Sequence, residues 1–169
     1  MTVPILAVYD SVKVTRIRGT IMAKEIKFYS TKEEYGCFSN FAAYPIKLDG
    51  KLWPTSEHYF QAQKFPDTDY QEKIRLDKSP TIAARLGRSR QVKLRPDWES
   101  VKESIMQKAV LAKFTQHLEL KEILLATEDA ILIEHTENDS YWGDGGNGSG
   151  KNRLGYILML VREQLKHTK

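Results

Sequence analysis

The sequence predicts a single helix-rich domain of the α+β class with a small β-sheet. The chain has 169 residues, a length at which one hydrophobic core is the usual arrangement. Segments with helical periodicity outnumber short extended segments. Strands and helices also do not alternate regularly, as they do in a doubly wound parallel sheet. We therefore expect one domain over residues 25–169, without repeats or an interdomain linker.

Residues 1–24 are expected to form a loosely attached N-terminal extension, in which Val12 and Val14 carry the main extended pattern. The first strand of the domain is expected over residues 26–29. Ile46 and Leu48 alternate with polar residues, and the pair Asp49-Gly50 that follows is typical of a tight turn. A hairpin over residues 44–53 is predicted.

Helix start signals follow in the middle of the chain. Thr55 can cap a helix that runs to about residue 65, and Thr68 with Gln71 forms a capping-box pattern. Ser79 followed by Pro80 predicts a third, short helix, because proline is favoured in the first turn. Gly87 is expected to end that helix.

Asp97 can cap a longer helix, of which one face is apolar. That face is formed by Trp98, Val101, Ile105, Ala109 and Ala112. A short helix is then expected over residues 119–126, a buried strand over 130–134 and a glycine-rich loop over 139–151. The chain ends in an amphipathic helix, marked by Leu154, Ile157, Leu158, Val161 and Leu165.

Composition narrows the functional class. Cys37 is the only cysteine, so no internal disulfide forms, and residues 1–9 lack the pattern of a secretory signal. No apolar run is long enough to span a membrane, so we expect a cytoplasmic protein. The net charge of +4 can attract anionic ligands such as phosphates or nucleic acid. The basic residues can equally form part of a mixed, solvated surface.

The glycine-rich loop contains spellings close to a dinucleotide fingerprint and to a Walker A motif, but neither fits. Asn152 stands where a Walker A motif needs Ser or Thr, and the chain ends before a second strand could follow. The glycines, with Lys151 and Arg153, can still form a phosphate site at the start of the last helix. The alternative is a flexible surface turn.

Glu57, Phe60, Gln61 and Lys64 recur at helical spacing, which places a carboxylate, a ring, an amide and an ammonium on one face. Such a stripe can supply acid–base groups to a cleft, or it can be an ordinary solvated helix face. The histidines are scattered without ligand spacing. We therefore expect no metal, and nothing in the sequence indicates a cofactor.

Aromatic and amide side chains can recognise a flat base or a sugar. Trp53, Trp98 and Trp142 can stack on a base or belong to the core. Phe38 and Asn40, in a Phe-Ser-Asn-Phe segment, can contact a sugar or a base edge.

Five segments together resemble the YbiA-like (NADAR) family of N-glycosidases, over about residues 26–165. They are YGCFSNF at 35–41, WPTSEHYFQAQKF at 53–65, RPDW at 95–98, YWGDGG at 141–146 and NRLG at 152–155. The resemblance implies the YbiA-like α+β fold. It also implies hydrolysis of the bond between a phosphorylated ribose and a nitrogen heterocycle. The substrate classes implied are ribosylamino-pyrimidine phosphates of riboflavin biosynthesis and ADP-ribosylated guanine, free or in nucleic acid.

Carried over by motif, the family's functional residues are Glu57, Trp98, Trp142 and Asp144. Some relatives use a lysine that forms a Schiff base with the ring-opened sugar, for which Lys64, Lys32 and Lys51 are all candidates.

Cleaving C1 from nitrogen builds positive charge on the sugar, which a carboxylate stabilises, while a second group protonates the leaving nitrogen or activates water. Glu57 and Asp144 are the expected pair, with Lys64 as a third catalytic candidate. The expected substrate contacts are Trp98, Trp142, Phe38, Asn40, Gly145, Gly146, Lys151 and Asn152.

A non-catalytic module that binds ADP-ribose, another nucleotide or nucleic acid is the alternative. Glu57 and Asp144 in one cleft would favour the enzyme, because carboxylates weaken phosphate binding unless chemistry needs them. No obligate protein partner is inferred. The sequence leaves open which substrate class is physiological, the oligomeric state and the role of residues 1–24.

Overall fold

The structure, a computed structural model, describes residues 23–168, and its predicted α+β class is confirmed. In chain order the elements are β1 (Glu25–Phe28), the short 3-10 helix η2 (Gly36–Phe38), β2 (Ile46–Leu48), β3 (Lys51–Trp53), α1 (Ser56–Ala62), α2 (Asp69–Leu76), α3 (Pro80–Arg88), α4 (Trp98–Gln116), α5 (Leu118–Ala126), β4 (Ile131–Glu134) and α6 (Arg153–Lys166). Val12, Val14 and most of the expected extension lie outside the described residues.

The strands form two separate pairs rather than one small sheet. β1 and β4 are parallel, with Glu25 opposite Ile131 and Phe28 opposite Glu134. β2 and β3 form the predicted antiparallel hairpin. Asp49 and Gly50 at its turn have φ values of 51° and 74°, as the favoured two-residue hairpin turn requires.

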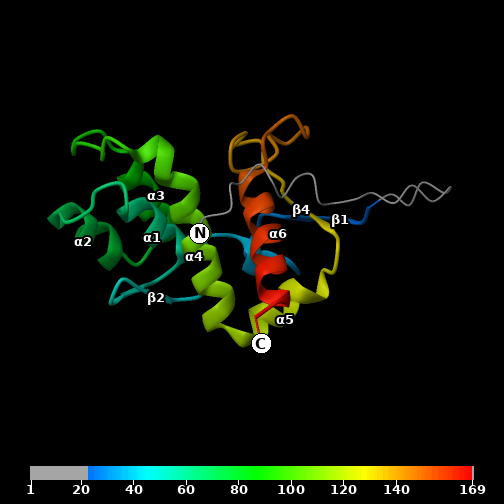
Figure 1. Cartoon of the computed structure of the whole chain (residues 1–169). Helices are drawn as coiled ribbons and strands as arrows, with labels where there is room; N and C mark the ends of the chain where they lie inside the picture. Colours follow the sequence, from blue (N-terminus) through cyan, green and yellow to red (C-terminus); the bar gives the residue numbers. More distant parts are fainter. Residues whose placement is uncertain (1–22, 169) are drawn as a thin grey trace.

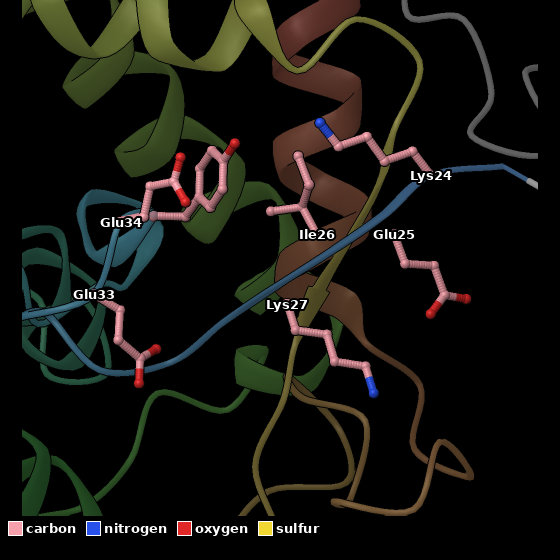
Figure 2. Close-up of a pocket in the computed structure, with 7 residues that line it drawn as sticks. Lys24, Glu25, Ile26, Lys27, Glu33 and Glu34 are labelled. Carbon is pink, nitrogen blue, oxygen red and sulfur yellow. The ribbon is translucent and has the colours of Figure 1, made fainter.

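Side chains alternate along β1 as expected for a strand that covers a core on one side. Ile26 and Phe28 are buried, whereas Glu25 and Lys27 are exposed. Figure 2 shows Glu25 and Lys27 on the opposite side of the strand from Ile26.

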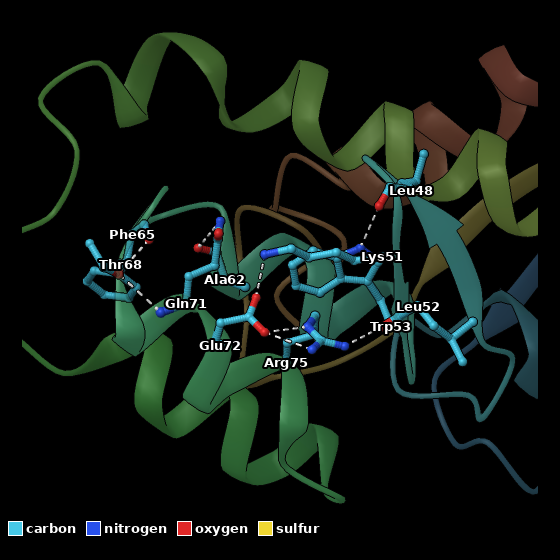
Figure 3. Close-up of polar contacts among 10 residues, drawn as sticks. All are labelled: Leu48, Lys51, Leu52, Trp53, Ala62, Phe65, Thr68, Gln71, Glu72 and Arg75. Atoms are coloured by element: carbon cyan, nitrogen blue, oxygen red, sulfur yellow. Dashed lines mark hydrogen bonds and ion pairs between the residues drawn. The ribbon is translucent and has the colours of Figure 1, made fainter.

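Three helices begin at the predicted capping residues. The side chains of Thr55, Thr68 and Ser79 each accept a backbone N–H from the first turn that follows. Figure 3 shows this cap at Thr68, whose hydroxyl accepts from the backbone N–H of Gln71 at 3.1 Å. Local sequence therefore fixes where these helices start.

Charged side chains fasten α2 to the hairpin. Glu72 pairs with Lys51 at 2.6 Å and with Arg75 at 2.7 Å, and Arg75 also donates to the carbonyl of Leu52 at 3.1 Å (Figure 3). The two cations lower the pKa of Glu72 to about 2. Because these groups are partly exposed, the contacts orient the hairpin more than they stabilise it.

Two helix ends differ from expectation. Gly87 does not end α3, which continues to Arg88. A Cβ at Gly87 would collide with the side-chain oxygen of Gln61, so glycine is needed there for close approach. Asp97 precedes α4 but its side chain makes no cap, because its carboxylate binds Arg95 at 2.6 Å.

Helix α4 lies between α1 and α6 (Figure 1) and contributes to two hydrophobic cores. On one side it packs with β1, β4, α5 and α6 through Met106, Val110 and Phe114. On the other side Ala109 and Ala112 pack against α1, α2 and the hairpin. Helix α1 contributes to both cores, which places it at their junction.

Candidate active site

Helix α1 is buried on every side. Tyr59 and Ala62 enter the core beneath the hairpin. The predicted stripe lies elsewhere on α1 and just beyond its end, and Glu57, Gln61 and Lys64 are only 6%, 7% and 8% exposed. The solvated-face interpretation of this stripe is therefore wrong.

Two predicted substrate contacts instead serve the fold. The backbone carbonyl of Asn40 accepts from the N–H of Glu57 at 3.2 Å, and its side-chain oxygen accepts from the Ser56 hydroxyl at 3.0 Å. Phe38 is 1% exposed and packs edge-on against Phe28. Asn40 thus holds the start of α1, and Phe38 belongs to the core.

Glu57 is a buried carboxyl with several charged neighbours. Burial raises its pKa, while a 2.7 Å hydrogen bond from Gln61 and the charges of Lys64 and Arg88 act in the opposite direction. Asp139 adds to the rise. Glu57 also lies in the first turn of α1, where the helix dipole favours a negative charge.

Lys64 is a buried amine beside Glu57. Burial lowers its pKa to about 8, partly offset by Glu57, while Arg90 and Arg88 lower it further. Its Nζ donates to the carbonyl of Gly87 at 3.2 Å. An amine with this pKa is in part neutral near neutral pH, which nucleophilic addition to a carbonyl carbon requires.

An aromatic cluster surrounds this amine. The ring of Phe60 lies 5.0 Å from that of Trp98 and 5.2 Å from that of Trp142, and the Lys64 Nζ lies 5.3 Å from the Trp98 centroid. Trp98 is 6% exposed, and Trp53 only 1%. Trp142 is partly exposed and is the tryptophan most available to a flat ligand.

Two further acids, which sequence reasoning missed, approach Glu57. Glu134 ends β4, and burial together with the charges of Asp139, Glu57 and Asp144 raises its pKa to about 8. The Asp139 carboxylate accepts from the N–H groups of Tyr141 and Trp142 at 2.8 and 2.7 Å. The sequence signal that could have identified Glu134 is a glutamate at the end of an apolar strand, directly before a loop.

Asp144 lies in the same neighbourhood but its oxygens are occupied. One accepts from the backbone N–H of Thr136 at 3.1 Å and of Gly146 at 2.9 Å, and the other bonds the His135 ring at 2.8 Å. These bonds outweigh burial and lower its pKa. The expected pairing of Glu57 with Asp144 as acid and base is therefore not favoured, because Asp144 stays ionised and organises the loop.

The N–H groups expected to face a phosphate donate inside the glycine loop. Gly145 donates to Asp139, Gly150 to Asp144, Lys151 to Ser140 and Asn152 to Gly143. Such bonds continue into α6, where Arg153 and Leu154 donate to the carbonyls of Tyr141 and Trp142. The geometry thus does not favour the anion site predicted at Gly145, Gly146 and Lys151.

The two side chains at the end of this loop also contact protein. The Lys151 Nζ lies 5.2 Å from the centroid of Tyr141. The Asn152 amide bridges to β4, accepting from the N–H of Glu134 at 2.9 Å and donating to the carbonyl of Leu132 at 2.8 Å. Asn152 fastens the loop to the strand that carries Glu134.

Two shallow surface hollows lie away from these residues. One, of about 380 Å³, borders β1 and includes Lys27 and Glu33 (Figure 2). The other, of about 460 Å³, lies beside the exposed Leu52 and Leu76. Within residues 23–168 no group of three or more side chains has a metal-binding arrangement. None of the helices in that range is long and apolar enough to cross a membrane.

Comparison with known proteins places these features in context. Residues 27–166 match the model of the NADAR domain. The chain is 64% identical to the N-glycosidase YbiA of Escherichia coli over 154 residues, which cover 91% of this chain and 96% of that protein. It is 45% identical over 150 residues to a riboflavin biosynthesis protein of Vibrio vulnificus, covering 89% of this chain and 41% of that protein. The NMR structure of E. coli YbiA superposes with a TM-score of 0.80 at 64% identity, covering 89% of this chain and 90% of that one.

Proposed function

Since the chain belongs to the NADAR family and is an N-glycosidase, we propose that it acts on a 5′-phosphorylated ribosyl heterocycle at Glu57. The substrate class we favour is a ribosylamino-pyrimidine phosphate, and ADP-ribosylated guanine is the second. A 45% identical relative named for riboflavin biosynthesis supports the first. The fact that the chain is an N-glycosidase rules against the purely non-catalytic module.

The observation that carries the proposal is the burial of Glu57 beside Lys64 at the edge of an aromatic cluster. As the bond from C1′ to nitrogen breaks, positive charge develops on the sugar. A carboxylate in a site of low dielectric stabilises that charge more strongly than one in water does. Water supplies the hydroxyl group that ends on C1′.

We assign the proton for the leaving nitrogen to Glu134 rather than to Asp144. With a pKa of about 8, Glu134 holds a proton at neutral pH and can donate it. Asp144 is held ionised by its three hydrogen-bond donors. When the environment gives two neighbouring acids different pKa values, the acid with the higher pKa commonly donates the proton and the other stays ionised.

Lys64 is the lysine best suited to a Schiff base. Lys32 and Lys51 are exposed, and Lys51 pairs with Glu72. In a ring-opened sugar, the neutral Lys64 Nζ adds to C1 and the heterocyclic amine leaves with a proton. Water then hydrolyses the imine and frees the lysine.

The experiment is to offer the purified chain both substrates and to measure released base and sugar phosphate. We expect hydrolysis of the ribosylamino-pyrimidine phosphate at the higher kcat/KM. Release of base only from ADP-ribosylated guanine would reverse the order of the two classes. Turnover of neither would contradict the proposal.

A further inference from the structure

Arg88, the last residue of α3, directly follows Gly87, which contacts Lys64, one of the two proposed catalytic side chains. The carbonyl of Gly87, one residue earlier, accepts from the Lys64 Nζ. The Arg88 charge acts on both Glu57 and Lys64, lowering the pKa of each. Arg88 is exposed, and in the described part of the chain no acidic side chain forms an ion pair with it.

Arg90 adds a second guanidinium at the same place. Its Nη1 donates to the carbonyls of Arg88 at 3.0 Å and of Ser89 at 3.3 Å, which holds its guanidinium group against the end of α3. Its charge also lowers the pKa of Lys64. Three cationic groups thus approach one another, an arrangement that a bound anion stabilises.

Of the other basic groups expected to bind phosphate, Arg153 forms an ion pair, whereas the exposed Lys151 ammonium lies near the ring of Tyr141. Arg153 is paired with Glu103 at 2.6 Å, and the N–H groups of the glycine loop donate internally. The end of α3 is therefore the better candidate for an anion site beside Glu57.

We propose that Arg88 and Arg90 form the subsite for the 5′-phosphate of the ribosyl substrate. This inference rests on the proposed function, which puts C1′ of the sugar at Glu57. The 5′-phosphate is attached at the far side of the same ring, so its binding site has to lie one sugar away from Glu57. Guanidinium groups bind phosphate through paired, charge-assisted hydrogen bonds.

The test compares a ribosyl 5′-phosphate substrate with its dephosphorylated counterpart. Arg88→Met is expected to lower kcat/KM on the phosphorylated substrate by on the order of 10- to 100-fold, mainly through KM, because a phosphate contact is made equally in ground and transition states. On the dephosphorylated substrate the loss is expected to stay within about threefold, and Arg88→Lys should restore part of the affinity.

Arg85→Met is the matched control, since Arg85 is exposed on the same helix and is not among the main causes of the pKa shifts of Glu57 and Lys64. It should leave both substrates unaffected, and circular dichroism should show that all variants are folded. The same variants are also tested on ADP-ribosylated guanine, in which a pyrophosphate stands in place of the 5′-phosphate. A loss on that substrate alone would overturn the monophosphate subsite.

Equal losses by Arg88→Met on both forms of the substrate would overturn the subsite, because Arg88 would then act only on Glu57 and Lys64. A phosphate-selective loss in Lys151→Ala instead would return the site to the glycine loop. Wild-type hydrolysis without any preference for phosphate would overturn the subsite and leave the proposed function standing. Full activity of Glu57→Gln would count against the proposed function itself.

Discussion

At the scale of single residues, the shared environment of Glu57 and Lys64 shifts the pKa values of both groups. Burial disfavours the charged form of each, while each charge favours the other. The amine therefore titrates at about 8, well below an ordinary lysine. A buried carboxyl group with a raised pKa beside an amine with a lowered pKa is an arrangement that occurs in active sites.

The proposed Schiff base predicts a covalent adduct on Lys64. Turnover of substrate in the presence of a borohydride should trap a sugar on this residue, located by peptide mass spectrometry. Lys64→Met should form no adduct and lose on the order of a hundredfold or more in kcat. Lys51→Met serves as the control and should behave as the wild type. An adduct on Lys32 or Lys51 would contradict the assignment.

Glu134 predicts a pH dependence of stability. Its folded pKa of about 8 lies above the ordinary value of 4.5, so the folded chain binds the extra proton between these values. The stability contributed by Glu134 is complete below about pH 4.5 and is lost as pH rises toward 8, by up to about 1.4 kcal/mol per pH unit.

Denaturant unfolding at several pH values checks this expectation. Glu134→Gln should remove that part of the slope and raise the free energy of unfolding near pH 8. Glu137→Gln, an exposed neighbour, should keep the wild-type slope. Parallel curves for wild type and Glu134→Gln would show that Glu134 is not held protonated.

At the scale of elements, the site depends on how α3 meets α1. Gly87 lets the side chain of Gln61 lie against the backbone of α3, and Gln61 in turn donates to Glu57. The side-chain oxygen of Gln61 is buried without a partner among the described residues. The position of the Gln61 side chain is therefore set by packing and by the hydrogen bond from its nitrogen to Glu57, because its oxygen makes no hydrogen bond to the described residues.

Gly87→Ala tests this contact. In a helix interior alanine normally stabilises by about 0.5–1 kcal/mol relative to glycine. Here we expect the opposite, a loss of about 1–3 kcal/mol with reduced kcat, because the added methyl collides with Gln61. Thermal unfolding and steady-state kinetics measure both effects. An increase in stability with normal activity would show that the contact relaxes easily.

Much at this scale could be predicted from the sequence because the signals are local. The side chains of Thr55, Thr68 and Ser79 each accept a hydrogen bond from a backbone N–H a few residues later. The hairpin turn likewise depends only on the pair Asp49-Gly50 that forms it. The roles of Gly87 and Asp144 could not be predicted, since they depend on contacts with Gln61 and Thr136 that only folding creates. The role proposed for Arg88 could not be predicted either, because it depends on how the end of α3 lies relative to α1.

At the scale of the whole molecule, the site lies where the two cores meet. Phe60 on α1 packs with Trp98 on α4 and with Trp142 in the loop before α6. Segments far apart in the sequence thus converge on one aromatic cluster, and Figure 1 shows α4 between α1 and α6. The sequence motifs indicated Phe60, Trp98 and Trp142, but only the folded structure shows that the ring of Phe60 contacts both tryptophan rings.

The expected division between residues 1–24 and the domain stays a proposal and can be tested by truncation. The match to the NADAR domain begins at residue 27 and β1 at Glu25. A chain beginning at residue 23 should therefore keep its melting temperature and its kcat/KM. A shift of several degrees or a loss of activity would assign the first residues to the working domain.

The most direct test of the central claim is kcat for Glu57→Gln on a substrate that the wild type hydrolyses. Glutamine keeps the shape of the side chain but removes its charge and its capacity for proton transfer. We predict a fall in kcat of on the order of a hundredfold or more with little change in KM. Glu122→Gln, at an exposed position of α5, should be unaffected. A folded Glu57→Gln enzyme with near-normal kcat would contradict the placement of the catalytic centre.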